Sequence, residues 1–344
     1  MTHFAGIIGA GNISETHARA VQALPGIEIA AVTGRDFAKA KNLASQFGGI
    51  AYADLQDFLA REPLDLVIIG SPSGLHAEQG IAAAARGLHV LVEKPIDIAL
   101  DRADALISAC ETARVKLGVI FQDRTKPDLK KLKQLIESGG IGKPGLVAAQ
   151  VKWYRPPEYY SKSHWRGTWA LDGGGALMNQ GIHTVDLLLW LMGDVTRVYA
   201  RAVTALHKIE AEDTVVATLE FTSGAVGTLE ATTAAFPGFD RRVEITGSKG
   251  TVILERDKVI SADLVDEASS FETSEQVDEN ASANSPAVSD IRGHCAVVED
   301  FVRAIDADTT PLCDGREGRR SLALVRAIYE SSQSGRPVAL SSTA

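Results

Sequence analysis

Side chains that could transfer a proton occur at two places in the chain. The first is the sequence EKP at 93–95, where Lys94 follows directly on the apolar run HVLV, which is typical of a buried strand. The second is GGGALMNQGIH at 173–183, where Asn179 and His183 are four residues apart and share one face of a predicted helix. An amine and an imidazole suit acid–base catalysis, and an amide can orient a hydroxyl group. These residues predict proton transfer at a substrate hydroxyl.

Each of these motifs also has a purely structural interpretation. Glu93 and Lys94 could form an ordinary ion pair at the exposed end of a strand. His183 could be a hydrogen-bonded histidine of a core. The residues alone leave both alternatives open, so the elements around the motifs must decide between them.

A third candidate segment, WYRPPEYYSKSHWRGTW at 153–169, is rich in aromatic residues. It contains three of the four tryptophans and three of the six tyrosines of the chain. Tyr154 and Trp165 could pack on the apolar face of a sugar or polyol ring, while Arg155 and Arg166 bind its hydroxyl groups or a cofactor. The alternative is a hydrophobic anchor between domains or subunits, which the sequence leaves equally open.

The elements that must position these residues begin with a glycine-rich turn. Gly9 and Gly11 follow an apolar run and precede a predicted helix that starts with Asn12 and Ile13. Glycines at these positions let the backbone turn tightly and let a pyrophosphate approach the N–H groups of the helix. Ser14 replaces the third glycine of the usual pattern and is small enough for the helix to pack. The turn predicts a dinucleotide site; a tight turn without a ligand is the alternative.

The end of the second predicted strand bears on the choice of dinucleotide. This strand ends in VTGRD, so Gly34 stands where an NAD site usually offers a carboxylate to the ribose 2′-hydroxyl. Arg35 can pair with a 2′-phosphate or stack on adenine. Asp36 is the counter-argument, although it is better placed to cap the next helix. The expected cofactor is therefore NADP in preference to NAD.

The order of the predicted elements indicates two domains. Residues 4–122 alternate short apolar runs with helical patterns that end in glycine, which is the rhythm of a doubly wound parallel sheet. Later runs alternate apolar and polar residues and are joined by glycine turns, which is typical of an antiparallel sheet. We expect an α/β protein with an N-terminal doubly wound Rossmann domain at 1–122. A C-terminal α+β domain with a mostly antiparallel open sheet would occupy 123–344, with the acidic stretch 255–290 as a solvated loop.

Composition narrows the possible partners. The chain has 344 residues, a net charge of −9 and scattered basic residues, so nucleic acid is not an expected partner. No apolar run approaches the roughly 20 residues that span a bilayer, and the N-terminal residues lack the pattern of a secretion signal. We expect a cytoplasmic protein without membrane contact. Three separated cysteines, Cys110, Cys295 and Cys313, predict neither a disulfide framework nor a metal site.

Taken together, the motifs resemble the Gfo/Idh/MocA oxidoreductases, a family named after glucose-fructose oxidoreductase, inositol dehydrogenase and a rhizopine-catabolism protein. The resemblance rests on the turn GAG at 9–11, GSPSGLHAEQ at 70–79, EKP at 93–95 and GGGALMNQGIHTVD at 173–186. It implies that Lys94 lies beside the nicotinamide, where the cationic ring and limited access to water would lower its pKa. It also implies a homodimer or homotetramer.

The resemblance assigns further residues to the site. Ser71, Pro72 and His76 of the second motif would cover the other side of the cofactor, with helix capping as the structural alternative for His76. Glu93 would provide the charge that compensates Lys94. His183 would act as acid/base or substrate ligand, whereas the family frequently has aspartate where this chain has Asn179.

These expectations converge on one reaction. The chain would transfer a hydride between a nicotinamide dinucleotide and a carbinol or carbonyl carbon of a sugar, polyol or sugar derivative, with Lys94 and His183 handling the hydroxyl proton. Two alternatives share the fold. One is a non-catalytic regulatory protein that binds NAD(P), and the other is a glycosidase that recycles tightly held NAD.

Overall fold

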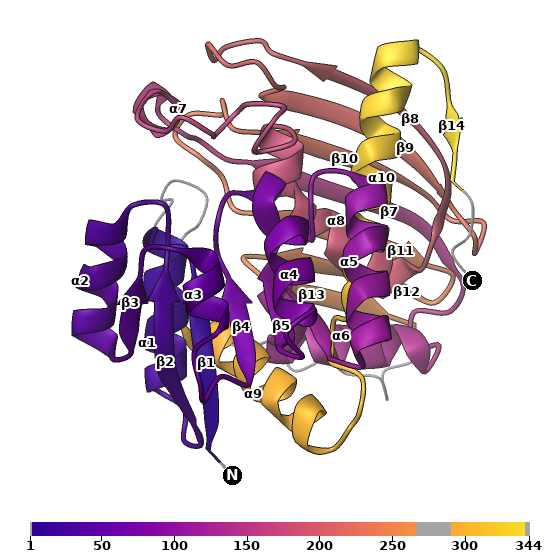
Figure 1. The fold of residues 1–344 in the computed structure, drawn as a ribbon. Coiled ribbons are helices and arrows are strands. Elements are labelled where there is room, and N and C mark those ends of the chain that lie inside the picture. The colour runs from indigo at the N-terminus through magenta and orange to yellow at the C-terminus, as the bar shows by residue number, and fades with distance from the viewer. Residues whose placement is uncertain (1, 266–289, 341–344) are drawn as a thin grey trace. The chain divides into compact units, whose positions relative to one another are not determined.

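The computed structural model describes residues 2–265 and 290–340, which fall into two compact units (Figure 1). Residues 2–122 and 290–319 form the first unit, and residues 123–265 and 320–340 form the second. The chain leaves the first unit at the predicted position, between Gln122 and Asp123. It then returns to that unit, which differs from the expectation that 123–344 forms a single domain.

The first unit contains a six-stranded parallel sheet in the order β3-β2-β1-β4-β5-β6. The strands are β1 (His3–Ile8), β2 (Ile27–Thr33), β3 (Ile50–Tyr52), β4 (Leu66–Ile69), β5 (His89–Glu93) and β6 (Leu117–Ile120). The helices that connect them are α1 (Asn12–Gln22), α2 (Phe37–Phe47), α3 (Leu55–Leu59), α4 (His76–Ala84) and α5 (Leu100–Ala113). All four residues of β4 are buried, as expected for a strand covered on both faces. The strand order reverses between β1 and β4, where such sheets bind ligands.

The segment that returns to the first unit is held by an apolar helix face. In α9 (Arg292–Asp306), Val298 and Phe301 are buried within the same core as Ile7 and Leu91 of the parallel sheet. α9 also packs beside α1. A helix with one strongly apolar face must bury it, and the core of the first unit provides the matching surface. Sequence order alone does not reveal this return.

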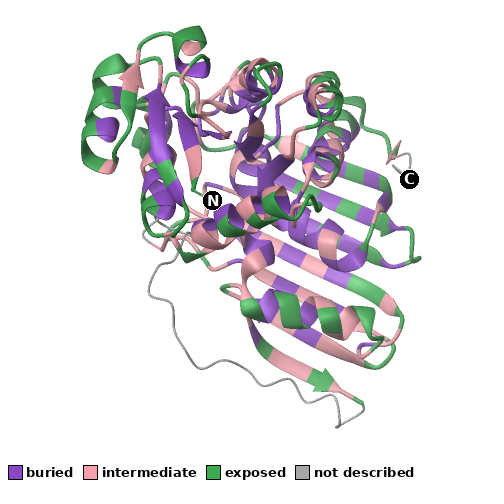
Figure 2. Ribbon diagram, turned by 60° about the horizontal axis from the view of Figure 1, so that its bottom comes forward, coloured by how far each residue is buried: buried purple, intermediate pink, exposed green. Residues whose placement is uncertain are grey.

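The second unit is built on an eight-stranded sheet in the order β13-β12-β11-β7-β10-β9-β8-β14. β7 and β10 pair in parallel, and every other neighbouring pair in this sheet is antiparallel. The strands are β7 (Pro144–Lys152), β8 (Val195–Val203), β9 (Thr214–Phe221), β10 (Val226–Thr232), β11 (Arg242–Gly247), β12 (Gly250–Glu255), β13 (Lys258–Leu264) and β14 (Val338–Ala339). Buried and exposed residues alternate along β9 and β10, so one face is covered and the other open (Figure 2).

Helices of the second unit carry the remaining motifs. They are α6 (Pro127–Glu137), α7 (Pro157–Ser161), the π-helix η3 (Ala176–Gly181), α8 (Ile182–Met192) and α10 (Gly315–Ser334), and the 3₁₀-helix η2 (Gln122–Thr125) precedes α6. The chain passes back into the second unit within α10. The predicted α/β protein with a Rossmann domain and a mostly antiparallel second sheet is confirmed.

The acidic stretch 255–290 is only partly a loop. Lys258–Leu264 form the edge strand β13, which pairs with β12 in an antiparallel hairpin. The apolar residues Val259, Ile260, Ala262 and Leu264 outweigh the local charge there, because an edge strand leaves its polar side chains in water. Residues 266–289 lie outside the described part of the chain.

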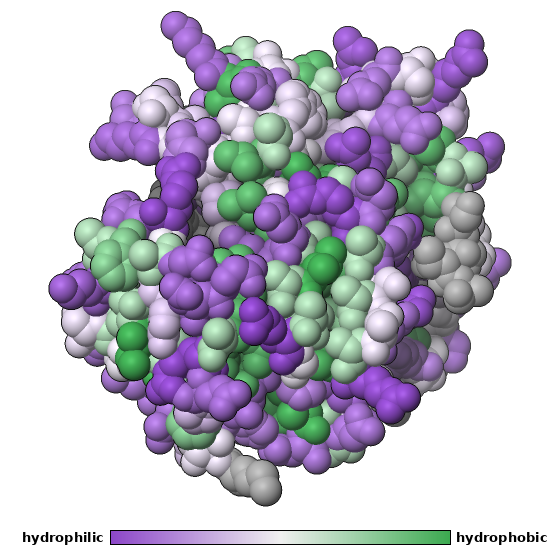
Figure 3. Space-filling view, viewed as in Figure 1, coloured by the Kyte–Doolittle hydropathy of each residue, from purple (hydrophilic) through white to green (hydrophobic). Residues whose placement is uncertain are grey.

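Charged and polar side chains cover much of the face in Figure 3, with apolar residues scattered in small groups. Within residues 2–265 and 290–340, no helix is both long and apolar enough to cross a membrane. The same residues contain no group of three or more His, Cys, Asp or Glu side chains arranged to hold a metal ion.

Candidate active site

The glycine turn has the geometry that a dinucleotide requires. Gly9 has a φ of +120°, and a Cβ built on it would lie 2.7 Å from the carbonyl oxygen of Gly70 and 2.8 Å from Oγ of Ser14. Gly11 caps α1, and a Cβ on it would meet nothing within 4 Å, so open space lies before the N–H groups of the helix. Asn12 is exposed, and Ile13 lies beside Gly70 at the end of β4. These residues therefore fit a bound pyrophosphate at the point where the strand order reverses.

The segment after β2 explains why glycine stands at position 34. A Cβ on Gly34 would lie 3.1 Å from Cβ of Ala10 in the glycine turn, so a larger residue would press on that turn. Arg35 is exposed. The Asp36 side chain accepts the N–H of Lys39 at 3.2 Å and caps α2, which confirms the expected capping role.

Lys94 lies at the carboxyl edge of the parallel sheet. From Val90 to Asp97 it is the only residue that is not buried, so this motif presents a single side chain outward. Glu93 is 6% exposed, and its Oε2 accepts the backbone N–H of Lys94 at 3.1 Å. The Glu93 side chain is therefore not part of a surface ion pair at the strand end.

Two histidines that sequence reasoning missed lie against Glu93. Nε2 of His17 in α1 is 3.2 Å from Oε1 of Glu93, and Nε2 of His294 in α9 is 3.9 Å from the same atom. Burial raises the pKa of Glu93, but the hydrogen bond and charge of His17, the charge of His294 and that of Lys94 together lower it to about 2. A fixed negative charge thus lies directly behind Lys94. Nothing in the sequence pairs His294 with Glu93, because the return of α9 creates this contact.

The motif after β4 folds over a buried histidine. Oγ of Ser71 donates to Oε1 of Gln79 at 2.6 Å, and the carbonyl of Pro72 accepts the N–H of Leu75. His76 begins α4 and is 1% exposed; its Nδ1 is 2.8 Å from the Pro95 carbonyl oxygen and its Nε2 is 2.9 Å from that of Ser71. The ring of His76 therefore contacts the turn after β4 and the turn after β5. Its role is not limited to capping α4.

In the second unit, the glycine-rich motif forms a turn of π-helix before α8, where the sequence predicts a continuous α-helix. Glu212 explains the difference. Its carboxylate accepts the N–H groups of Gly175 at 2.9 Å and Leu177 at 2.8 Å, and the hydroxyl of Tyr329 at 2.9 Å. A Cβ on Gly175 would lie 1.9 Å from the Glu212 carbonyl oxygen, so only glycine fits there. π-helical turns are frequent at functional sites.

Asn179 and His183 are the partly exposed residues of this motif. In the fully described stretch from Asp172 to Leu189, these two residues are the only ones that are not buried. Nδ2 of Asn179 donates to Oδ1 of Asp172 at 2.8 Å, and Asp172 is 1% exposed. A carboxylate therefore adjoins Asn179, although the sequence suggested that its charge was missing. The sequence contains little sign of this contact, because Asp172 lies before the three glycines and Asn179 lies after them.

A second carboxylate, Asp123, lies near His183. Arg124 binds Asp186 through Nε at 2.9 Å and Nη2 at 2.7 Å, which fixes η2 against the first turn of α8. Burial raises the pKa of Asp123, but Arg241, Lys126 and His183 hold it well below its ordinary value. Asp186, which shares a face with His183 in the sequence, instead binds Arg124.

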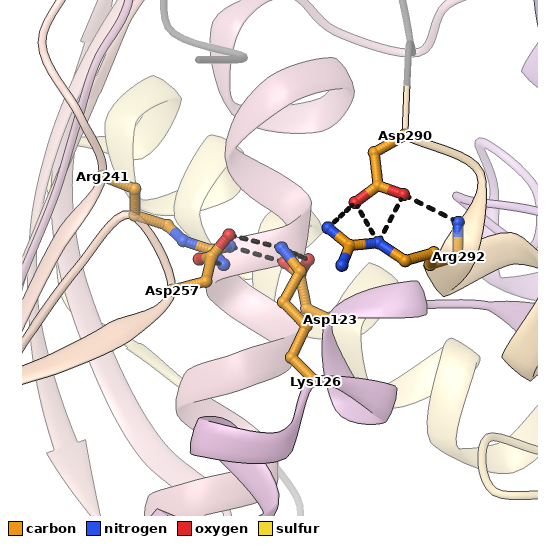
Figure 4. A network of polar contacts seen from close by, with 6 residues as sticks. All are labelled: Asp123, Lys126, Arg241, Asp257, Asp290 and Arg292. Carbon is orange, nitrogen blue, oxygen red and sulfur yellow. Dashed lines mark hydrogen bonds and ion pairs between the residues drawn. The ribbon is translucent and has the colours of Figure 1, made fainter. Parts of the chain in front are cut away.

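Figure 4 shows the ion pairs around Asp123. Oδ2 of Asp123 accepts from Nη1 of Arg241 at 2.7 Å, and Oδ1 lies 2.9 Å from Nζ of Lys126. Asp257 contacts both cations from the turn before β13. These ion pairs connect η2, through Asp123, with the segments that precede β11 and β13. In the first unit, Arg292 pairs with Asp290.

The aromatic segment packs on the same helix. Arg166 lies over the ring of Tyr159, 4.2 Å from its centroid, and over Trp165 at 5.5 Å. The Tyr159 hydroxyl accepts from Nε2 of Gln180, between Asn179 and Gly181 in η3, at 3.0 Å. Arg155 is 3% exposed and stacks on Trp153 and Tyr159.

Tyr154, also proposed from the sequence, packs edge-on against Phe236 with ring centroids 5.2 Å apart. The segment thus places two guanidinium groups, Arg155 and Arg166, among the rings beside η3. Both cations lie within the aromatic cluster.

A parallel dinucleotide fold with a glycine turn, followed by a second unit in which η3 and α8 carry a partly exposed amide and imidazole, defines a class of two-domain nicotinamide-dependent oxidoreductases. Residues 4–121 match the oxidoreductase family with an NAD-binding Rossmann fold, and residues 129–253 match the GFO/IDH/MocA C-terminal domain. The chain belongs to the GFO/IDH/MocA family of oxidoreductases. The predicted family, enzyme class and nicotinamide dinucleotide are thereby confirmed.

Individual relatives span nearly the whole chain. A D-xylose 1-dehydrogenase (NADP⁺) of Haloferax volcanii is 31% identical, over 91% of this chain and 92% of its own. The myo-inositol 2-dehydrogenase of Thermotoga maritima is 28% identical, over 97% and 98%. The crystal structure of the WlbA dehydrogenase of Bordetella pertussis, in complex with NADH and UDP-GlcNAcA, is 33% identical, with a TM-score of 0.88 over 99% of both chains.

Proposed function

We propose that the chain oxidises a CH–OH group of a sugar, polyol or sugar derivative, or reduces the corresponding carbonyl. The observation that carries this proposal is that Lys94, Asn179 and His183 are the accessible residues of two otherwise buried motifs. When bound, the nicotinamide dinucleotide supplies the hydride acceptor or donor. Relatives that act on xylose and myo-inositol, and one bound to a sugar nucleotide, support this class of substrate.

In this proposal, Lys94 and His183 are the groups that exchange the hydroxyl proton. The buried Glu93 carboxylate holds the backbone of Lys94, and the amide of Asn179, anchored by Asp172, orients the hydroxyl group. An amide cannot take the proton, so its role is binding and alignment.

The proposed cofactor contacts come from the turns at the carboxyl edge of the parallel sheet. Gly9, Gly11, Asn12 and Ile13 would face the pyrophosphate, and Gly34 and Arg35 the adenosine ribose, with NADP preferred. Ser71, Pro72 and His76 would flank the nicotinamide half together with Glu93 and Lys94, and Arg166 of the second unit is a further candidate.

The proposed sugar contacts are Tyr154, Arg155 and Trp165, in addition to Lys94, Asn179 and His183. Ring stacking and charged donors beside η3 support this assignment. The expected homodimer or homotetramer stays a prediction. The open face of the second sheet, where Leu146, Val216 and Val226 are 50%, 51% and 51% exposed, is the surface through which it would form.

The test is steady-state production of NADPH or NADH with a panel of sugars, polyols and sugar acids, for the wild type and Lys94→Met. We expect turnover with at least one substrate and a loss of at least about a hundredfold in the variant, because a positioned acid–base group contributes roughly that much. Cofactor affinity, measured by fluorescence titration, should be preserved. Glycoside cleavage without net reduced cofactor, or binding without any turnover, would replace the proposal with the recycling glycosidase or the regulatory protein.

A further inference from the structure

His76 connects the turns that follow two neighbouring strands. Ser71 follows β4, and Pro95 follows Lys94 at the end of β5; the imidazole lies between their carbonyl oxygens at 2.9 and 2.8 Å. The side chain is 1% exposed, so water does not replace either contact. One ring thus ties the turn over the proposed cofactor site to the peptide that carries Lys94.

The two contacts fix the number of protons on the ring. A carbonyl oxygen only accepts hydrogen bonds, so each contact requires an N–H on His76. A neutral imidazole has one N–H, and its other nitrogen would point a lone pair at a carbonyl oxygen less than 3 Å away. Only the imidazolium form donates to both oxygens.

The carboxylates near the ring favour the imidazolium form, whereas burial opposes it. Burial is the largest influence and holds the pKa of His76 below its ordinary value, although the two carbonyl contacts and the charges of Glu93 and Asp97 raise it in part. The doubly protonated ring is therefore the form present at acidic pH. Asp97 is itself fully buried, and its Oδ1 lies 3.4 Å from Nε of Arg102 in α5. The two carboxylates compensate a positive ring in a site closed to water.

Neighbouring basic side chains do not take the place of His76. Arg102 donates to the carbonyl of Gly74 at 2.6 Å and contacts Asp97, and His17 and His294 face Glu93. These contacts hold the surrounding loops, but the bridge between Ser71 and Pro95 runs through His76.

We propose that His76 is a positioning residue, a doubly protonated clamp that holds the peptide after Lys94 against the turn at Ser71. The inference rests on the proposed function, since it assigns Lys94 to catalysis. The clamp is complete below the pKa of His76 and loses one of its two hydrogen bonds as the pH rises through that value. Lys94 would then be less firmly aligned with the cofactor site.

The first test counts the ring protons directly. Nitrogen NMR of ¹⁵N-histidine-labelled protein with NADP, recorded from about pH 5 to about pH 9, distinguishes protonated from unprotonated ring nitrogens. The spectrum of His76→Gln identifies the His76 signals. We expect both nitrogens to be protonated at least in the acidic part of this range. A nitrogen that stays unprotonated at every pH at which the protein is folded would overturn the inference, whether or not the protein oxidises a sugar.

The second test measures positioning. Where the ring carries both protons, His76→Gln should lower kcat at least about tenfold, since a misalignment of about 1 Å can cost more than that. The ratio of wild-type to variant kcat should fall toward one as His76 loses a proton. His3→Gln, which removes a histidine at the opposite edge of the sheet, is the matched control and should leave kcat within about twofold. A ratio near one at every pH would show that His76 only fills space, and absence of turnover in the wild type would instead count against the proposed function.

Discussion

Three buried carboxylates show how the surroundings of a residue decide its charge. Burial alone raises the pKa of each, yet the histidines around Glu93 lower its pKa to about 2, and Arg241 and Lys126 hold that of Asp123 well below its ordinary value. Glu212 has only neutral donors as partners, and its pKa is raised to about 7. Charged partners outweigh desolvation at Glu93 and Asp123, whereas the neutral hydrogen-bond donors at Glu212 do not.

At the residue scale, Gly34→Asp should weaken NADP far more than NAD. The new carboxylate would repel a 2′-phosphate, and its Cβ would also press on Ala10. Gly34→Ala separates the two effects, because it adds the same Cβ without a charge and should weaken both cofactors alike. Fluorescence titration of the variants with each dinucleotide measures this, and an equal loss for NAD and NADP in Gly34→Asp would refute the assignment of this site.

Asn179→Asp should destabilise the protein more at pH 8 than at pH 5. It would place a second carboxylate against Asp172, now 2.8 Å from the Asn179 amide, and one of the two pKa values must then rise. A raised pKa in the folded state means that the shared proton stabilises the pair at low pH and is lost as the pH increases. Urea unfolding at both pH values provides the measurement.

The matched control for that variant is the exchange Asp172→Asn with Asn179→Asp, which restores one amide and one carboxylate. It should recover much of the stability at pH 8. If the double variant is no more stable at pH 8 than Asn179→Asp, then the loss of stability in Asn179→Asp does not come from the contact between residues 172 and 179.

At the scale of elements, Glu212, which accepts hydrogen bonds at the start of η3, makes stability depend on pH. The folded-state pKa of about 7 lies above the ordinary 4.5, so Glu212 favours folding below pH 4.5 and loses that contribution as the pH rises to about 7. The difference corresponds to roughly 3 kcal/mol of unfolding free energy.

Glu212→Gln should therefore flatten the pH dependence of stability between pH 5 and pH 8, because glutamine has no proton to lose in this range. Denaturant unfolding at several pH values tests this, with Glu210→Gln as a control in the same loop. An unchanged slope in Glu212→Gln would mean that Glu212 is ionised throughout.

At the scale of the whole molecule, the first unit requires α9. Phe301→Ala should lower the free energy of unfolding by about 3–5 kcal/mol, since it removes a fully buried ring from the core. Glu299→Ala, on the exposed face of the same helix, is the control and should have little effect. The measurement is chemical unfolding together with cofactor binding. Loss of stability without loss of cofactor affinity would show that α9 is not needed for the nucleotide site.

Short sequence patterns correctly predicted turns, helix caps and strand ends, because these features depend on neighbouring residues. The glycine turn, the cap at Asp36 and the strand ending at Glu93 follow from short sequence signals, and the structure has them where expected. Contacts over long sequence separations were not predictable. His294 reaches Glu93, and Glu212 turns the start of η3 into a π-helix, because distant segments are adjacent in the fold. Periodicity reports which face is buried, but not what buries it.

The discontinuity of the first unit has a consequence for biosynthesis. The ribosome completes the six parallel strands by Ile120, but α9 begins only at Arg292, after residues 123–265 of the second unit have been made. Translation proceeds at ~5–20 residues per second, so α9 is synthesised on the order of ten seconds or more after the six strands whose core it completes. During that interval the apolar surface that later receives Phe301 is open to chaperones, so a helix that is translated late completes the first domain to emerge.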